Sequence, residues 1–193
     1  MSEDLDNLRK TVISCNKCDL AKTRTNAVPG LGHYKSEIIF IGEAPGRNED
    51  LKGEPFVGTA GKILSEALEY AGLPRNRVYI TNVVKCRPPN NRQPNTQEID
   101  SCNSYLLEEL RLICPKIICI LGNTAFGSLL NGNSITKNRG KIIKRDGQIY
   151  FVTVHPAAVI YNPQLHQVLK DDLKLLAEIL DKIKKGISIE NTQ

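Results

Sequence analysis

Four short apolar segments recur along the chain, separated by segments with helical periodicity. The apolar segments are rich in Ile and Val and mostly continuous: Glu37–Ile41, Arg77–Val84, Lys116–Leu121 and Ile149–Val154. Continuous runs of this length are typical of strands covered on both faces, as in a parallel sheet. Apolar positions three and four residues apart predict helices over Ala60–Ala71, Gln97–Ile113, Asn123–Leu130 and Leu165–Lys185. Strands that alternate with helices predict an α/β domain.

Polar side chains and glycines follow three of the predicted strands. The first strand leads into Gly42–Gly46, the second carries Asn82 near its end, and the fourth leads into His155. In open α/β sheets, ligands bind outside the carboxyl ends of the strands. We therefore expect Glu43, Asn82 and His155 to converge on one site.

The length of 193 residues and the hydrophobic content of 40% are those of one ordinary globular domain. The apolar runs are far shorter than the roughly 20 residues that span a bilayer, and residues 1–10 contain no apolar segment typical of a secretory signal. We expect a single cytoplasmic domain over residues 1–193, without a membrane partner. Within it we expect an amino-terminal arm over 1–30 and a flexible tail over 186–193.

Positive charge is segregated along the sequence. The formal net charge is only +5, but no acidic residue occurs between Tyr70 and Gln97 or between Leu110 and Arg145, where basic residues are frequent. Segregated positive charge favours a polyanionic partner such as a nucleic acid. Because such runs also form ordinary solvated surfaces, charge alone leaves the partner open.

Six cysteines in a chain expected to be cytoplasmic indicate metal binding or core packing before disulfides. Cys15 and Cys18 form a C-x-x-C motif in a polar segment, whereas Cys86 and Cys102 lie beside the ends of predicted elements. Four such thiolates suit either tetrahedral zinc or a [4Fe–4S] cluster, and spacing does not separate the two. A metal there would tie the arm to the basic loop that follows the second strand. We expect the remaining two cysteines to pack in the core: Cys114 and Cys119.

Several motifs, in order along the chain, resemble those of the family 4 uracil-DNA glycosylases, the iron–sulfur type found in many archaea and bacteria. They are GEAPG (Gly42–Gly46), GEPFVGTAG (Gly53–Gly61), TNVVKCRPP (Thr81–Pro89), HPAA (His155–Ala158) and the cysteines Cys15, Cys18, Cys86 and Cys102. The resemblance implies a four-stranded parallel sheet flanked by helices, and a structural [4Fe–4S] cluster on those four cysteines. It also implies removal of uracil from single- or double-stranded DNA, which leaves an abasic site for base excision repair. We expect a monomer, with a sliding clamp as a further candidate partner.

The matching residues suit chemistry on a base that has been flipped out of the DNA stack. Phe56 would stack on the uracil ring, and the Asn82 amide would match uracil O4 and N3–H. His155 would donate a hydrogen bond to O2 as the leaving base gains negative charge. Glu43 would stabilise the positive charge on the sugar or position the attacking water, and the backbone of Gly42–Ala44 would contact the base.

Two regions are expected to contact DNA. Arg87 belongs to the basic loop after the second strand, and an apolar side chain after the HPAA motif would wedge into the base stack, with Val159, Ile160 and Tyr161 as the candidates. Two other functions stay open. One is a non-catalytic module that binds single-stranded nucleic acid through a four-cysteine metal site, and the other is a glycosylase of the same superfamily for a different deaminated base.

Overall fold

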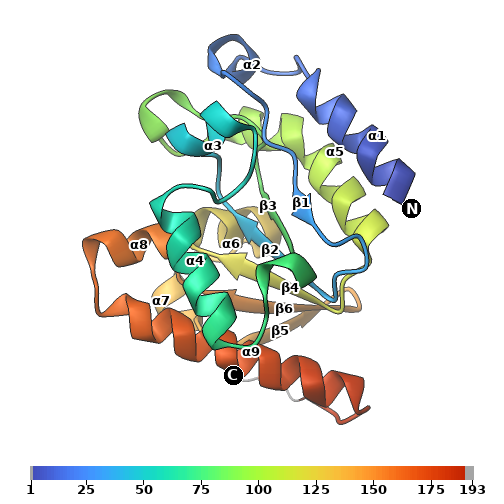
Figure 1. The fold of residues 1–193 in the computed structure, drawn as a ribbon, viewed down its shortest axis with the longest axis vertical. Helices are drawn as coiled ribbons and strands as arrows, with labels where there is room; N and C mark the ends of the chain where they lie inside the picture. The colour runs from blue at the N-terminus through green and yellow to red at the C-terminus, as the bar shows by residue number, and fades with distance from the viewer. Residues whose placement is uncertain (1, 190–193) are drawn as a thin grey trace.

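A mixed six-stranded sheet forms the centre of the computed structural model, which describes residues 2–189 (Figure 1). Its order is β1-β3-β2-β4-β6-β5, with the bounds β1 Leu31–Gly32, β2 Ile38–Gly42, β3 Tyr79–Asn82, β4 Ile117–Leu121, β5 Ile142–Arg145 and β6 Gln148–Thr153. The central strands β3, β2, β4 and β6 are parallel to one another. At the two edges, β1 and β5 pair antiparallel to their neighbours.

The expected count of four strands is wrong, although the four predicted strands are the central parallel ones. Both additional strands lack the continuous apolar run on which the prediction rested. β1 is only two residues long, and β5 changes from Ile142 and Ile143 to Lys144 and Arg145. An edge strand is covered less completely than a central one, so its sequence carries a weaker apolar signal.

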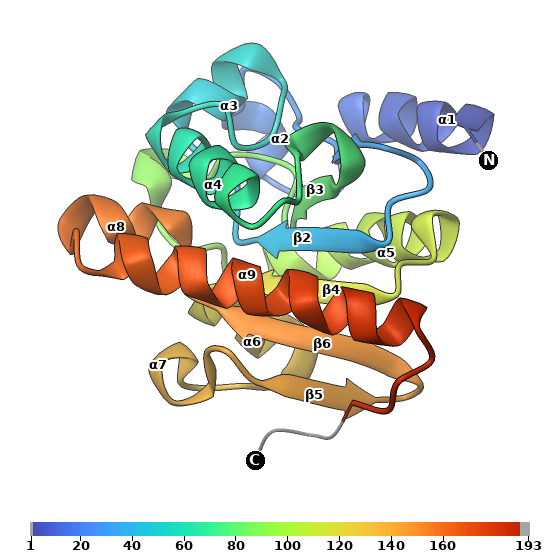
Figure 2. The same cartoon turned by 60° about the horizontal axis from the view of Figure 1, so that its bottom comes forward.

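Successive residues of the central strands point into two separate cores. Ile39 and Ile41 of β2 pack into one core, and Ile38 and Phe40 pack into the other. The first core is covered by α1 (Ser2–Ile13), α5 (Thr96–Ile113) and α6 (Asn123–Leu130), and the second by α4 (Thr59–Tyr70) and α9 (Leu165–Lys184). Figure 2 shows α9 lying along one face of the sheet with α1 and α5 on the other. The remaining helical segments are shorter: α2 (Leu20–Thr23), α3 (Arg47–Lys52), η1 (Arg75–Arg77), η2 (Pro89–Asn91), α7 (Ile135–Asn138) and α8 (Pro156–Tyr161).

The four predicted helices agree with α4, α5, α6 and α9 to within one residue at either end. The start of α5 is fixed by a reciprocal cap, in which Asn95 Oδ1 accepts from the Glu98 N–H at 2.9 Å and Glu98 Oε2 accepts from the Asn95 N–H at 2.8 Å. Within the described range, no helix combines the length and apolar character that a membrane span needs.

The expected flexible tail over 186–193 is described only in part. Ile189 is buried against the second core, and Lys144 Nζ donates a hydrogen bond to its carbonyl oxygen. Residues 190–193 lie outside the described residues.

Candidate active site

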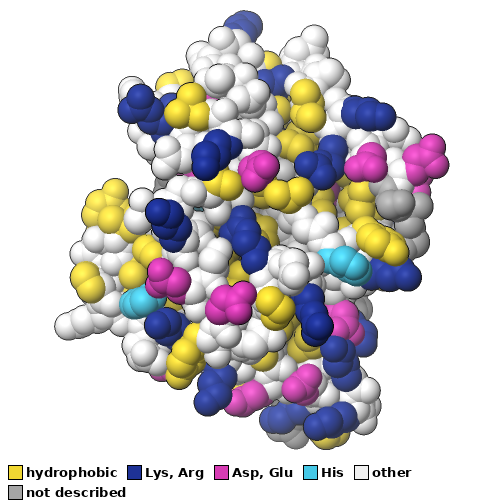
Figure 3. All heavy atoms as spheres, viewed as in Figure 1, with side chains coloured by type: hydrophobic (Ala, Val, Ile, Leu, Met, Phe, Trp, Pro, Cys, Tyr) yellow, Lys and Arg dark blue, Asp and Glu magenta, His cyan; other side chains and the backbone are white. Residues whose placement is uncertain are grey.

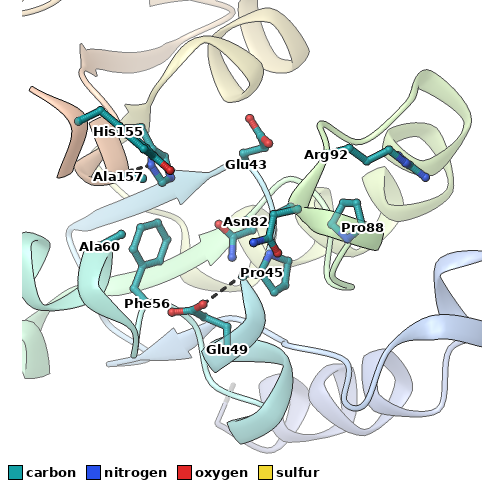
Figure 4. A pocket seen from close by; sticks show the side chains of 14 residues that line it. Glu43, Pro45, Glu49, Phe56, Ala60, Asn82, Pro88, Arg92, His155 and Ala157 are labelled. Carbon is teal, nitrogen blue, oxygen red and sulfur yellow. Dashed lines mark hydrogen bonds between the residues drawn. The ribbon is translucent and has the colours of Figure 1, made fainter. Parts of the chain in front are cut away.

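A pocket of about 290 Å³ opens at the carboxyl ends of the central strands. It brings together Glu43, Asn82 and His155, which follow or end β2, β3 and β6 (Figure 4). Ala44 and Phe56 also line it, as do residues to which the sequence analysis gave no individual role: Pro45, Gly46, Glu49, Ala60, Pro88, Asn91, Arg92 and Ala157. The site therefore lies where the strand order predicts a ligand crevice.

Asn82 is the last residue of β3 and carries an unused hydrogen-bond acceptor. Its side chain lines the pocket, the residue is 1% exposed, and Oδ1 has no hydrogen-bond partner. An unsatisfied buried polar atom costs about 1–3 kcal/mol. An acceptor held in this way is ready for an N–H donor on a ligand.

Gly42, at the end of β2, lies directly against two of the pocket walls. A Cβ at this position would lie 2.5 Å from Asn82 Oδ1 and 2.6 Å from Phe56 Cζ. No real side chain can approach so closely, so glycine permits Asn82 and Phe56 to stand where they do. Gly42 itself is not among the residues that line the pocket.

An aromatic ring and an imidazole ring lie on the same side of the pocket. Phe56 adopts the left-handed backbone conformation, with φ 53°, in the loop between α3 and α4. Its ring centroid lies 5.6 Å from that of His155, and the two planes are inclined by 35°. Figure 4 shows both side chains beside the Asn82 carboxamide. A flat ring of this kind offers a stacking surface for a planar ligand.

His155 is held as a neutral imidazole of defined orientation. It caps the start of α8, where Nδ1 accepts a hydrogen bond from the Ala157 N–H at 3.1 Å. Burial lowers the pKa of His155 to about 4, and the nearby charge of Glu49 opposes this shift only in part. Because Nδ1 is the acceptor, the proton of the neutral ring is on Nε2, which is left as a donor.

The Glu43 carboxylate is held by a residue of α6 rather than by Asn82. The hydroxyl of Thr124, in α6, donates a hydrogen bond to Glu43 Oε2. In Figure 4 the carboxylate points away from Asn82. In this place it can act on a bound sugar or on water rather than on the base edge.

Glu49 joins the two loops that carry Glu43 and Phe56. The residue is buried; its Oε1 accepts from the N–H groups of Val57 at 2.9 Å and Gly58 at 2.7 Å, and its Oε2 accepts from the Gly46 N–H at 3.1 Å. No role was assigned to Glu49 from the sequence alone. The three-residue spacing from Gly46, typical of a capping box, was the signal that could have identified it.

The basic loop contributes to the pocket through Arg92 rather than through Arg87. Arg92 lines the pocket and forms an ion pair of 2.6 Å with Glu98. Arg87 donates through Nε to Asn91 Oδ1 at 2.7 Å, and this contact supports the same loop from outside the lining. Arg87 is therefore placed at the border of the site.

The three candidate wedge residues of α8 have very different exposures. Val159 is 7% exposed and packs into the second core, so its expected DNA contact is corrected. Ile160 is 47% exposed and Tyr161 is 89% exposed, and of the three only Tyr161 lines the pocket. A large exposed aromatic side chain at the mouth of a pocket is available to a partner.

The four cysteines of the expected metal centre lie near one another, with Cys102 in α5 itself and Cys15 two residues after the end of α1. Cys86 and Cys102 are buried in the first core, and Cys15 and Cys18 pack against it. Burial raises the pKa of Cys102 to about 11, and the neighbouring Cys86 and Cys18 thiols contribute to this increase. Among residues 2–189, no three His, Cys, Asp or Glu side chains are grouped so as to hold a single metal ion.

A guanidinium group lies against these thiols. Arg24 donates to Cys86 Sγ at 3.0 Å and to the Cys15 carbonyl oxygen at 2.6 Å. A set of four neighbouring thiols beside a guanidinium group fits a negatively charged centre that takes four thiolate ligands.

The two remaining cysteines have different surroundings. Cys119 is fully buried in β4, as predicted. The expectation of a buried Cys114 is wrong, because this residue is exposed at the carboxyl end of α5, where the backbone turns with φ 48°.

The charge segregation seen along the sequence does not persist in space. Basic residues from the acid-free runs pair with acids from other segments, as in Lys116–Glu37, Lys85–Glu109, Arg92–Glu98 and Arg139–Asp172. Figure 3 shows Lys and Arg interspersed with Asp and Glu on the face viewed. The positive runs therefore do not by themselves mark a binding surface on that face.

Comparison with known proteins identifies the family to which this chain belongs. The family model described as the uracil DNA glycosylase superfamily matches residues 29–184. A type-4 uracil-DNA glycosylase of Archaeoglobus fulgidus is 49% identical, over 93% of this chain and 95% of the relative. The corresponding values are 49%, 92% and 85% for a type-4 uracil-DNA glycosylase of Sulfurisphaera tokodaii, and 40%, 93% and 96% for one of Thermotoga maritima.

The chain belongs to the uracil DNA glycosylase superfamily. Relatives from archaea and from a bacterium, matched over nearly their whole length, place it more closely among the type-4 uracil-DNA glycosylases.

Proposed function

We propose that this protein hydrolyses the N-glycosidic bond between uracil and deoxyribose in DNA and leaves an abasic site for base excision repair. Water adds to C1′ of the sugar, the C1′–N1 bond breaks, and uracil leaves with the bonding electrons and takes up a proton. The names of the relatives support this reaction. The observation that carries the proposal is the buried Asn82 with its unpaired Oδ1 in a pocket that also holds a flat ring and a neutral imidazole.

Asn82 is the proposed reader of the base. Its Oδ1 would accept from uracil N3–H and its amide nitrogen would donate to O4. Cytosine offers an amino donor and an unprotonated N3 at the same edge, so a fixed amide would reject it. Phe56 would stack on the flipped ring, and the backbone of Gly42–Ala44 would close the pocket beside it.

His155 is the proposed stabiliser of the leaving group. Its Nε2–H would donate to uracil O2 as negative charge develops there, which favours the transition state over the ground state. A neutral donor suffices, in agreement with a pKa lowered to about 4.

Glu43 is the proposed partner of the sugar. Its carboxylate, oriented by Thr124, would stabilise the positive charge that develops at C1′ or position the attacking water.

A [4Fe–4S] cluster on Cys15, Cys18, Cys86 and Cys102 is the proposed cofactor. When bound, it would join the amino-terminal arm, the segment after β3 and the start of α5 as a structural cross-link. Cys86 and Cys102 lie in the first core and Cys15 and Cys18 pack against it, so four thiols are available to such a cluster. The relatives' type-4 family is consistent with this choice.

DNA would reach the site across α8 and the basic loop. We assign the wedge to Tyr161, with Ile160 beside it, because both are exposed and Tyr161 borders the pocket. Arg87 would contact the backbone of single- or double-stranded DNA. A cytoplasmic monomer that cooperates with a sliding clamp remains part of the proposal.

The test is excision from a labelled single-stranded oligonucleotide with one uracil, incubated in EDTA and then treated with alkali. We expect cleavage at uracil and none where thymine or cytosine replaces it. His155→Ala and Asn82→Ala should each reduce the single-turnover rate by about 10²–10³-fold.

Absence of cleavage by iron-loaded protein would overturn the proposal. Cleavage of hypoxanthine- or xanthine-containing DNA alone would redirect it to another deaminated base. Salt-dependent binding without any product, together with zinc in the metal analysis, would redirect it to a non-catalytic binding module.

A further inference from the structure

A buried ion pair lies directly behind Asn82. Lys85 Nζ and Glu109 Oε2 are 2.7 Å apart, and the two side chains are each 1% exposed. Burying two charges costs solvation that their attraction often fails to recover, so such a pair is weak evidence of a stabilising role. Because the pair lies beside the pocket, its place favours a function in positioning a residue of the site.

Every N–H of the Lys85 ammonium has an acceptor. Besides Glu109, Nζ donates to Thr81 Oγ1 at 2.6 Å and to the backbone carbonyl oxygen of Asn82 at 2.8 Å. An ammonium group has three donors, so none is left over. Lys85 does not line the pocket, and its contact with the site is therefore made through the Asn82 peptide.

Glu109 anchors this lysine to three parts of the fold. From α5, its Oε2 accepts from the Thr81 hydroxyl at 2.8 Å, and its Oε1 accepts from the Gly30 N–H at 2.9 Å and the Tyr79 hydroxyl at 3.4 Å. The network thus joins the amino-terminal arm, β3 and α5, and all of its groups are satisfied. A fully satisfied buried network holds its members in one arrangement.

The same lysine also contacts the cysteine region. Its backbone N–H donates to Cys102 Sγ at 3.4 Å, and Cys86 is the next residue in the chain. The short segment from Asn82 to Cys86 therefore carries the proposed base reader at one end and a proposed cluster ligand at the other.

We propose that Lys85 and Glu109 are positioning residues for Asn82. The pair fixes the Asn82 peptide at the end of β3, and this holds the carboxamide in the orientation that matches uracil. The inference rests on the proposed function of Asn82 and extends it to two residues that do not touch the base.

The test compares Lys85→Met with the double variant Lys85→Met/Glu109→Gln, using single-turnover excision of uracil, affinity for abasic product DNA, and melting temperature. Lys85→Met leaves a buried carboxylate without its cation, so it should lower both stability and rate. In the double variant the buried charge is gone, so stability should return, while the excision rate stays about 100-fold below that of the wild type. Affinity for product DNA should stay within about twofold, because its phosphate contacts are unchanged.

A double-mutant cycle separates positioning from general damage. In an Asn82→Ala background, Lys85→Met should cause little further loss of rate, because the residue that it positions is already absent. Leu180→Ala provides the stability control, because Leu180 packs in the second core. It lines another cavity together with Glu37, which precedes the amino end of β2, whereas the candidate active site lies at the carboxyl end. At a temperature where all variants are folded, Leu180→Ala should excise uracil at the wild-type rate.

Near-wild-type excision by the double variant would overturn the positioning role, and so would a rate loss that simply multiplies with that of Asn82→Ala. Wild-type protein that fails to excise uracil would instead contradict the proposed function. The wild-type reaction therefore distinguishes the two failures.

Discussion

The ionisation of His155 should determine how the enzyme responds to acid. Its pKa is lowered to about 4 by burial, so we expect a nearly constant excision rate from pH 8 to about 5.5 and a fall towards pH 4. Protonation would place a hydrogen on Nδ1 and break its bond from Ala157. A pH–rate profile under single-turnover conditions checks this, and a midpoint near pH 6.5 would contradict it.

Acid should also lower the stability of the fold through His155. Between pH 6.5 and about 4 the unfolded chain binds a proton at this position and the folded chain does not, so acidification through this window favours unfolding. Rates should therefore be measured below the melting temperature determined at each pH.

Gly42→Ala should damage the pocket with one methyl group. The new Cβ would meet Asn82 Oδ1 and Phe56 Cζ at 2.5 and 2.6 Å, so at least one of these walls must move. Because a displacement of about 1 Å can cost about 100-fold in rate, we expect a loss of 10–100-fold. Single-turnover kinetics measure it, and Gly127→Ala, where a Cβ would meet only the Gly132 carbonyl oxygen at an ordinary contact distance of 3.5 Å, reports the background effect of such a change. Equal rates for the two variants would contradict this account.

At this scale, the sequence predicts residues at strand ends better than residues that support them. Asn82 and His155 could be inferred because a strand end has a known place in an α/β sheet. Glu109 could not, because its partners Gly30, Tyr79 and Thr81 are distant in sequence and only the folded chain brings them together. Val159 was misplaced because an apolar residue beside a site can equally well belong to the core.

Two neighbouring residues of α3, Glu49 and Asp50, have different structural roles. Glu49 holds the loop that carries Phe56, whereas Asp50 Oδ1 accepts from the N–H groups of Thr25 and Asn26 at 2.8 and 3.2 Å. Glu49→Ala and Asp50→Ala each remove a buried acceptor, so each should lower the free energy of unfolding by about 1–3 kcal/mol.

Only Glu49→Ala should also reduce uracil excision, by about 10–100-fold, because only that loop carries a pocket wall. Denaturant unfolding and single-turnover rates of the two variants check this. A similar rate loss in Asp50→Ala would contradict the division of tasks.

Helix α8 should influence duplex DNA more than single strands. Tyr161→Ala removes the proposed wedge at the mouth of the pocket but leaves Asn82 and His155 in place. Excision from a U·A duplex should therefore fall by about tenfold or more, while excision from a single strand changes little. Val159→Ala tests the neighbouring buried side chain, which should affect melting temperature instead. Equal losses on both substrates would contradict a wedge.

The sequence also predicts elements with a clear apolar pattern better than elements without one. The four predicted helices have apolar residues at helical spacing and the four central strands are apolar runs, whereas β1, α2 and α7 are two to four residues long and depend on their neighbours. Helix α1 has few apolar positions, and its burial comes from packing against α5. Tertiary contacts, rather than local preference, decide such segments.

The melting temperature and the visible absorbance of the protein should depend on the four clustered cysteines and not on the exposed Cys114. Cys102→Ser should abolish the visible absorbance of the proposed cluster and lower the melting temperature by on the order of 10 °C, because a cross-link between arm, loop and helix is lost. Cys114→Ser should change neither quantity, since this thiol is exposed. Iron content, absorbance and thermal unfolding check both variants. Full iron content in Cys102→Ser would contradict the ligand assignment.

The two edges of the sheet bear on how the protein behaves at high concentration. An exposed edge strand offers free backbone N–H and C=O groups to a second chain and can seed aggregation. Here β1 offers only two residues, and the outer strand β5 ends in exposed Lys144 and Arg145. A short edge on one side and a charged edge on the other both discourage strand-to-strand pairing between molecules, so the open sheet resists growth into larger assemblies.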